Sequence, residues 1–379
     1  MANKKPVYND EQLDIWINRI SGIYHQLSLD LFETMVDRLV VRGAADLKRV
    51  PYIWQLDKLS DMHMLNEQNL KLISKRTGIA KKLLREVIEN EGLKLYEDTK
   101  GQLMDDMGVD GDLGTGAVQR ALQAYCTQTF IDIDNLINTT LPMSVRKTYE
   151  EIVTQTVAEV VTGSKTADKA LNDTVMRWFD KGFYGFTDKA GRRWKADVYA
   201  RTIIKSTTYR VYNEMRMRPA QELGIDTFHY SMKATAREMC APLQNRIVTT
   251  GQTRVENGVR VLSVHDYGYG DPGGCRGIGC GHMMTPFLPG INKIPELPDH
   301  LKKITPEQAI KNANAQAKQR AFERQIRKNK ERLQVAKKLG DQERMAKFKL
   351  RDKQLSAGLN KLIDEHEFLH RDRKRERVY

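Results

Sequence analysis

The sequence predicts a mostly helical α+β protein with a helical N-terminal region, a small α+β domain and a long basic C-terminal helix or helical hairpin. Apolar residues recur at helical spacing before residue 180, and short β-prone runs between glycine-rich turns follow. Beyond residue 300 the chain is highly charged. Because 379 residues exceed what one hydrophobic core usually serves, we expect three regions, at 1–180, 181–294 and 295–379.

The N-terminal region is expected to begin with a long amphipathic helix. Asn9 is a suitable N-cap, and Gln12 follows three positions later, as in a capping box. Apolar residues then recur at three- and four-residue steps: Leu13, Trp16, Ile20, Tyr24, Leu27, Leu31 and Met35. They form one face of the helix, which must pack against another element to be buried.

Further helices are expected up to about residue 180, with breaks between them. Gly78 should interrupt the helical pattern, and residues 107–112 are typical of a loop. Helical spacing resumes at Gly114. It is broken at Leu141–Pro142, after which Ser144 is a candidate cap for the next helix.

The small domain is expected to start with a hairpin at residues 181–194, where glycines and aromatic residues suit a tight turn. A helix over 197–223 should follow and end at Gly224, with Pro219 kinking its last turns. Three short strand candidates complete the α+β order, at 227–232, 245–249 and 259–262.

The C-terminal region is expected to be a linker followed by a long charged helix. Two prolines mark the linker at 295–298, and Thr305–Gln308 combines an N-cap, a proline in the first position and a capping-box glutamine. Gly340–Asp341 can fold the helix into a hairpin. Because its apolar positions are sparse, we expect this helix to lie along a partner surface or to protrude.

Most of the net charge of +13 belongs to the C-terminal segment. Residues 301–379 hold 23 Lys and Arg against 11 Asp and Glu, a net +12, which leaves +1 for the rest. Such a segment favours a polyanionic partner, and contact with double-stranded DNA is the functional interpretation of the basic end, at Arg371, Arg373, Lys374, Arg375 and Arg377. The alternative is an exposed charged helix with internal ion pairs, which the interleaved acidic residues favour.

Cysteine content and hydropathy point to a protein that stays in the cytoplasm where it is made. Four cysteines in so long a chain argue against a disulfide scaffold, and the N-terminus lacks the apolar stretch of a secretory signal. The longest apolar runs are well short of the roughly 20 residues of a membrane span, so no membrane partner is expected.

A glycine-rich loop between Tyr267 and Gly290 carries the candidate metal ligands. Cys275, Cys280 and His282 lie within it, and Cys240 lies upstream, which together make a Cys₃His set suited to a structural zinc ion. The spacing of Cys280 and His282 is unusual for zinc, and the competing interpretation is buried thiols with a hydrogen-bonded histidine.

Catalysis is a further alternative for the same residues. A cysteine could act as nucleophile with His229 or His265 as base, although nothing in the spacing specifies that pairing. The loop does not match a Walker or dinucleotide-binding pattern, so nucleotide binding is disfavoured. The acidic turn at 105–112 lacks the ligand spacing of a calcium loop.

The order of motifs between about 185 and 292 resembles a known family. An aromatic-Gly hairpin leads to Val-Tyr-Ala-Arg at 198–201, then Glu-Leu-Gly at 222–224 and Ala-Arg-Glu-Met-Cys at 236–240. Tyr-Gly at 267–268, Gly-Cys-Gly-His at 279–282, and then Pro-Phe and Pro-Gly complete the order. The stretch is similar to the tailed-phage minor capsid, or minor head, proteins related to the phage Mu head morphogenesis protein.

Two departures from the family pattern concern the candidate site. Cys240 stands where that family usually has histidine, which replaces one zinc ligand by another. Gly279 and Gly281 replace the Asn and Arg that flank the family's cysteine, so any role of those polar groups is in doubt here.

The resemblance implies a non-enzymatic structural protein of the virion head, made in the host cytoplasm. It would assemble at the portal vertex with the portal protein and the major capsid protein or scaffold, and act in procapsid assembly and in DNA packaging or ejection. Residues 1–180 would contact portal or capsid, 181–294 would be the Mu-type domain, and 295–379 the basic tail. The alternatives are a Cys/His-dependent enzyme or toxin-like module, and a zinc-stabilised nucleic-acid-binding protein.

Overall fold

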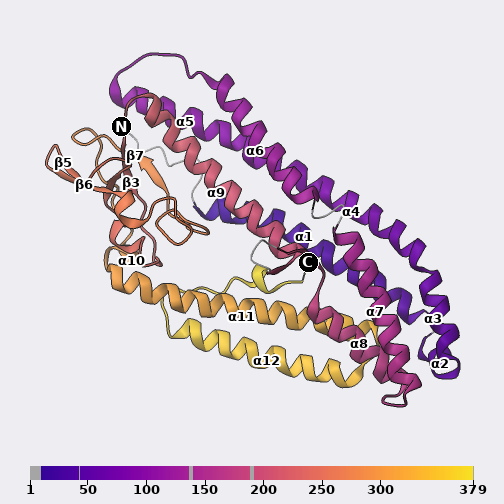
Figure 1. Cartoon of the computed structure of the whole chain (residues 1–379). Helices are drawn as coiled ribbons and strands as arrows, with labels where there is room; N and C mark the ends of the chain where they lie inside the picture. Colours follow the sequence, from indigo (N-terminus) through magenta and orange to yellow (C-terminus); the bar gives the residue numbers. More distant parts are fainter. Residues whose placement is uncertain (1–9, 42, 136–139, 188–191, 379) are drawn as a thin grey trace.

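The N-terminal region forms an elongated bundle of helices (Figure 1). In this computed structural model the described residues are 10–41, 43–135, 140–187 and 192–378, so the predicted Asn9 cap lies outside them. The bundle contains, in chain order, α1 (Asp10–Val40), α2 (Gly43–Arg49), α3 (Pro51–Ser60), α4 (Met62–Arg85), the π-helical turn η1 (Glu86–Asn90), α5 (Glu91–Met107), α6 (Thr115–Asn135), α7 (Leu141–Val161) and α8 (Ala167–Lys181).

The apolar face predicted for α1 is confirmed. Leu27, Leu31 and Met35 are fully buried, and Trp16 is half-buried against the same core. This face packs against α4 and against a later helix, α9 (Ala196–Glu222). Helical periodicity therefore placed the core of the bundle correctly.

Two of the predicted helix boundaries are wrong. Gly78 lies inside α4 on its exposed side, where burial of neighbours such as Ile73 on the other side outweighs the low helix propensity of glycine. Ser144 is not a cap but lies within α7, whose first turn already contains Pro142. The loop expected near residue 110 does separate α5 from α6.

Helix α9 connects the bundle to the small domain. Its first half contributes Ala200 to the bundle core, and its last turns contribute Met217 to the core beside the sheet. It ends just before Gly224, as predicted. Because one helix contributes to both cores, the boundary at residue 181 stays a prediction.

The small domain contains the predicted hairpin, β1 (Tyr184–Thr187) and β2 (Arg193–Lys195), and a five-stranded sheet. The sheet has the order β5-β6-β4-β3-β7, with β4 and β6 parallel and the other pairs antiparallel. The three predicted strands appear as β3 (Thr227–Tyr230), β4 (Ile247–Thr249) and β6 (Val259–Ser263), whereas β5 (Arg254–Glu256) and β7 (Met284–Pro286) were not predicted.

The C-terminal region is a helical hairpin, as predicted. The short helix α10 (Asp299–Lys302) precedes α11 (Pro306–Lys338), where Thr305 Oγ accepts a hydrogen bond from the Gln308 amide at the N-cap. The chain turns at Gly340, and Asp341 caps α12 (Gln342–Asp364) by accepting from the Arg344 amide. The last short helix is η5 (Arg373–Glu376).

The expectation that α11 lies on a partner or protrudes is wrong. This helix packs along the bundle against α1 and α8, and its other side holds α12 (Figure 1). Ala309, Ile326 and Val335 are buried, and so are polar residues such as Asn329. None of the helices within the described residues is long and apolar enough to cross a membrane.

Candidate functional site

The glycine-rich loop is held in a tightly folded shape by its own backbone. The Cys275 amide donates to the Tyr267 carbonyl at 2.9 Å, and the Cys280 amide donates to the Gly277 carbonyl at 3.0 Å. At Gly274 a side chain would collide with the backbone of Gly268. The loop therefore holds the residues just before β7 in a fixed position.

Three of the four predicted ligands come together at the end of this loop. Cys280 Sγ lies 3.7 Å from Cys240 Sγ and 3.4 Å from His282 Nδ1. The three ligand atoms lie within 4.8 Å of one another, and all three side chains are buried. Two thiols and an imidazole at this separation are a donor set that suits zinc.

The imidazole of His282 is held in position on both sides. Its Nε2 donates to Gln244 Oε1 at 3.0 Å, and the same oxygen accepts from the Lys233 amide at 2.7 Å. Its ring stacks on Tyr230 with a centroid distance of 5.0 Å. A histidine fixed through one nitrogen presents the other to the thiols, as is usual for a metal-ligating histidine.

Cys275, the fourth predicted ligand, points elsewhere. Its buried thiol donates to the Val264 carbonyl at 3.4 Å, and burial raises its pKa to about 11. It belongs to the same apolar core as Cys240 and Cys280 but not to the group of three ligand atoms. Cys126 is buried in the helical bundle.

The electrostatics of the cluster favour one thiolate. The hydrogen bond from the Cys240 thiol lowers the pKa of Cys280 against the opposing effect of burial, and His282 and Arg276 act in the same direction. The pKa of Cys240 is correspondingly raised. Nε and Nη1 of Arg276 are buried without a hydrogen-bond partner, so a positive group accompanies the cluster. A thiolate is the form that ligates metal.

The two histidines proposed as catalytic bases are held by other partners. His229 Nε2 lies 3.0 Å from Asn245 Oδ1, and burial lowers the pKa of this histidine. His265 Nε2 donates to the Thr250 carbonyl at 3.1 Å. These contacts place both imidazoles in structural roles and give no support to a nucleophile–base pair that includes His229 or His265.

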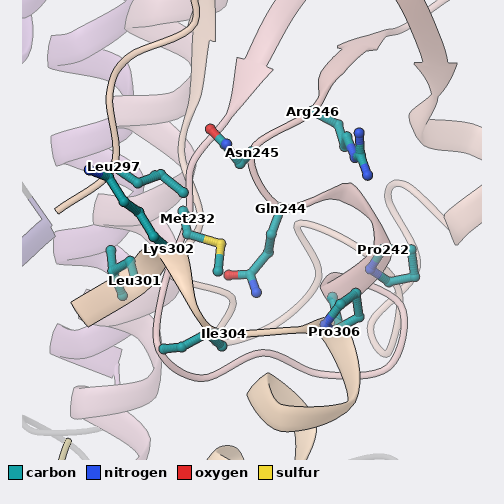
Figure 2. A pocket seen from close by; sticks show the side chains of 11 residues that line it. Met232, Pro242, Gln244, Asn245, Arg246, Leu297, Leu301, Lys302, Ile304 and Pro306 are labelled. Atoms are coloured by element: carbon teal, nitrogen blue, oxygen red, sulfur yellow. The ribbon is translucent and has the colours of Figure 1, made fainter. Parts of the chain in front are cut away.

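A pocket of about 290 Å³ is lined in part by Gln244 (Figure 2). It is bounded by the turn before β4 and by the segment that leads into α11, including Met232 and Ile304. Its lining contains two cations, Arg246 and Lys302, and no acidic residue or histidine. Neither Gln244 nor Tyr230 had a spacing signal that would have assigned it to the site.

The predicted basic residues at the C-terminus divide into two groups. Arg371 makes two hydrogen bonds of 2.7 Å to Glu376, and Arg375 contacts Asp372 at 3.0 Å. By contrast, three of the predicted residues are exposed: Arg373, Lys374 and Arg377.

These C-terminal residues surround a second pocket of about 400 Å³. Arg371, Arg373 and Arg377 line it together with Lys330 of α11, and Glu376 and Asp352 are the acidic groups in its wall. The fold thus gathers some of the predicted phosphate-binding residues at one place between α11 and α12.

Comparison with known proteins relates nearly the whole chain to phage structural proteins. The family described as phage minor capsid protein 2 matches residues 8–364. A structural protein of Lactococcus phage LL-H is 30% identical over 376 residues, which cover 95% of this chain and 98% of that protein. A structural protein of Lactococcus phage mv4 is 33% identical over 116 residues, 31% of this chain and 90% of that protein. No solved structure matches.

Proposed function

The chain belongs to the phage minor capsid protein 2 family, and we propose that it is a head component that associates with the portal vertex and acts in procapsid assembly and in DNA packaging or ejection. The observation that carries this proposal is the family match across residues 8–364, joined by full-length similarity to a phage structural protein. A capsid protein has other virion proteins as partners. Its family is structural, which implies a non-enzymatic role.

An exposed apolar face on α3 supports contact with the portal protein. Tyr52, Ile53 and Leu56 are between 62% and 69% exposed and lie on one side of this helix. α3 is at the end of the bundle far from the sheet (Figure 1). Adjoining apolar side chains left in water often mark protein interaction sites. We propose that this end of the N-terminal region contacts the portal protein, with major capsid protein or scaffold as the other candidate partners.

The portal contact is tested by co-expression with the portal protein of the same genome and size-exclusion chromatography. We expect a complex with the wild type and its loss with I53N/L56N. The matched control is Leu350→Asn on α12, a residue 59% exposed, which should leave the complex intact. A wild-type protein that elutes alone, and is missing from purified virions, would overturn the head assignment.

We also propose that Cys240, Cys280 and His282 hold a structural zinc ion, with Cys275 as the fourth ligand after a side-chain rotation. The support is the buried group of three ligand atoms and the fixed His282 ring. Metal content is measured by mass spectrometry on purified protein, and we expect about one zinc per chain. C240S and C280S should lose it, whereas C126S, a buried cysteine in the bundle, should retain it. If C275S retains zinc, the fourth ligand is water or another residue rather than Cys275.

The basic C-terminus is proposed to contact packaged DNA through its exposed residues, Arg373, Lys374 and Arg377. Each phosphate contact contributes about −0.9 to the slope of log affinity against log salt. R373Q/K374Q should therefore reduce the slope by about two in a duplex-binding titration. An unchanged slope would show that these residues do not contact DNA phosphates and are only solvent-exposed.

A further inference from the structure

A half-buried histidine links two helices that are distant in the sequence. His25 of α1 lies 2.7 Å from Asp197 in the first turn of α9, and its other nitrogen lies 2.7 Å from Glu331 of α11. One helical turn closer to the sheet from each carboxylate stands an arginine, Arg201 on α9 and Arg327 on α11. Because both carboxylates hold the same imidazole, these arginines lie on neighbouring parts of one surface.

The cations continue for a further turn along both helices. Lys205 follows Arg201 on α9, and Arg324 precedes Arg327 on α11. The C-terminal turn η5 packs against α11 beside α9 and adds Arg375 (Figure 1). We call the following five residues the basic seam: Arg201, Lys205, Arg324, Arg327 and Arg375.

Two of the five seam residues lie beside a carboxylate at ion-pair distance. Arg327 lies 3.7 Å from Glu331, which it shares with His25, and Arg375 contacts Asp372. Within the described part of the chain, the other three seam residues make no ion pair. Arg201 donates to the neutral Asn18 amide oxygen at 3.1 Å.

The fold holds these like charges together against their repulsion. Loss of solvation lowers the pKa of Arg201, and the charges of Arg327, Arg375 and Arg324 lower it further, whereas Asp14 raises it. Loss of solvation also lowers the pKa of Lys205; the charge of Asp14 opposes this shift, and Arg201 acts in its direction. Lys205 Nζ lies 5.7 Å from the ring centroid of Tyr209, whose hydroxyl donates to Asp14 rather than to a seam residue. A bound polyanion would relieve this repulsion.

We propose that the basic seam binds the phosphodiester backbone of duplex DNA. Cations repeated one turn apart on two helices, roughly 5–6 Å between neighbours, suit a ligand with many regularly spaced anions. Four of the five are arginines, whose planar guanidinium binds phosphate through two hydrogen bonds. The seam also continues through η5 to the exposed Arg373 and Lys374. This inference rests on the proposed DNA contact but assigns it to residues of α9 and α11.

The test is duplex binding by the full chain, measured by fluorescence anisotropy over a series of salt concentrations. R201Q/K205Q removes two seam charges, and R351Q/K353Q removes two exposed charges from α12, so the net charge changes equally. We expect the seam variant to bind at least ten-fold more weakly, with a salt slope lower by about two. The α12 control should stay within about two-fold of wild type. Thermal unfolding of both variants checks that each is folded.

Equal weakening by both double variants would overturn the seam, because only net charge would then matter. A seam variant that binds DNA normally but loses the portal complex would assign the seam to an acidic protein surface instead. Weakening by R373Q/K374Q alone would overturn the seam while retaining the C-terminal contact. A wild type that binds portal but no duplex would exclude DNA contact and leave the head assignment standing.

Discussion

His25 Nδ1 lies 2.7 Å from a carboxylate oxygen of Asp197, which is 172 positions later in the chain. Burial alone would lower the pKa of His25, but its hydrogen bonds to Asp197 and Glu331 raise it to about 9. The same bond lowers the pKa of Asp197 although burial opposes this. A protonated His25 between two carboxylates therefore joins α1, α9 and α11.

This arrangement predicts a stability that depends on pH. The folded pKa of His25 is raised above its unfolded value of 6.5, so its contribution is complete below that pH and is lost as the pH rises through about 9. The Asp197 contribution has the opposite sign and is lost as the pH falls below its ordinary value of 3.8. In urea unfolding at several pH values, the wild type should lose roughly 3 kcal/mol of unfolding free energy relative to His25→Gln between pH 6.5 and 9.5.

His25→Gln supplies the control for this prediction. It keeps hydrogen-bonding capacity but removes the charge, so its unfolding free energy should lie below that of the wild type at pH 6.5 and approach it by pH 9.5. A variant with the same alkaline decline as the wild type would show that other groups cause it.

Lys58 is predicted to stabilise the end of α1. It is 2% exposed, and its amine donates to the carbonyls of Arg38 and Val41, each at 2.7 Å. Lys58→Met removes both bonds and leaves helix-end carbonyls without that donor, which should cost about 3 kcal/mol of unfolding free energy. Lys71→Met on the exposed side of α4 should change it by less than about 0.5 kcal/mol. Equal effects would contradict the capping role.

Removal of metal provides a further prediction. When free zinc exceeds its dissociation constant 1,000-fold, binding adds about 4 kcal/mol to stability. A chelator should therefore lower the thermal midpoint of the wild type, and added zinc should restore it. C126S should respond in the same way, whereas the thermal midpoint of C280S should be the same with chelator and with added zinc. If the thermal midpoint of the wild type does not change with the chelator, the three residues are ordinary core residues that hold no metal.

Local signals in the sequence predicted those parts of the fold that depend on neighbouring residues. The face of α1 follows from helical spacing, and the cap at Thr305 follows from residue preference. The turn at Gly340 follows from the preference of glycine for a left-handed backbone, which this residue adopts. Strand β5 was missed because two of its three residues are charged and it lies between Gly251 and Gly258, in a stretch typical of a turn, and β7 was missed because it contains a proline at the sheet edge.

The features that sequence could not predict depend on distant partners. α11 was expected to bury little, yet Asn312 donates to the Ala234 carbonyl and Asn329 to the Phe348 carbonyl, so polar residues are buried through specific hydrogen bonds. At the candidate site, residue type identified Cys240, Cys280 and His282. The rotamer that turns Cys275 away is set by the Val264 carbonyl, which no spacing rule includes.

Two adjacent glycines in the loop provide the last prediction. A Cβ at Gly274 would lie 1.8 Å from the Gly268 carbonyl oxygen, whereas one at Gly273 would meet nothing within 4 Å. Gly274→Ala must therefore displace backbone and should cost roughly 3 kcal/mol, with loss of zinc because Cys280 is carried by the same loop. Gly273→Ala should unfold within about 0.5 kcal/mol of wild type and keep its zinc. Chemical unfolding and metal content measured on both variants decide the matter, and a tolerated Gly274→Ala would mean that the loop does not hold Cys280 in place.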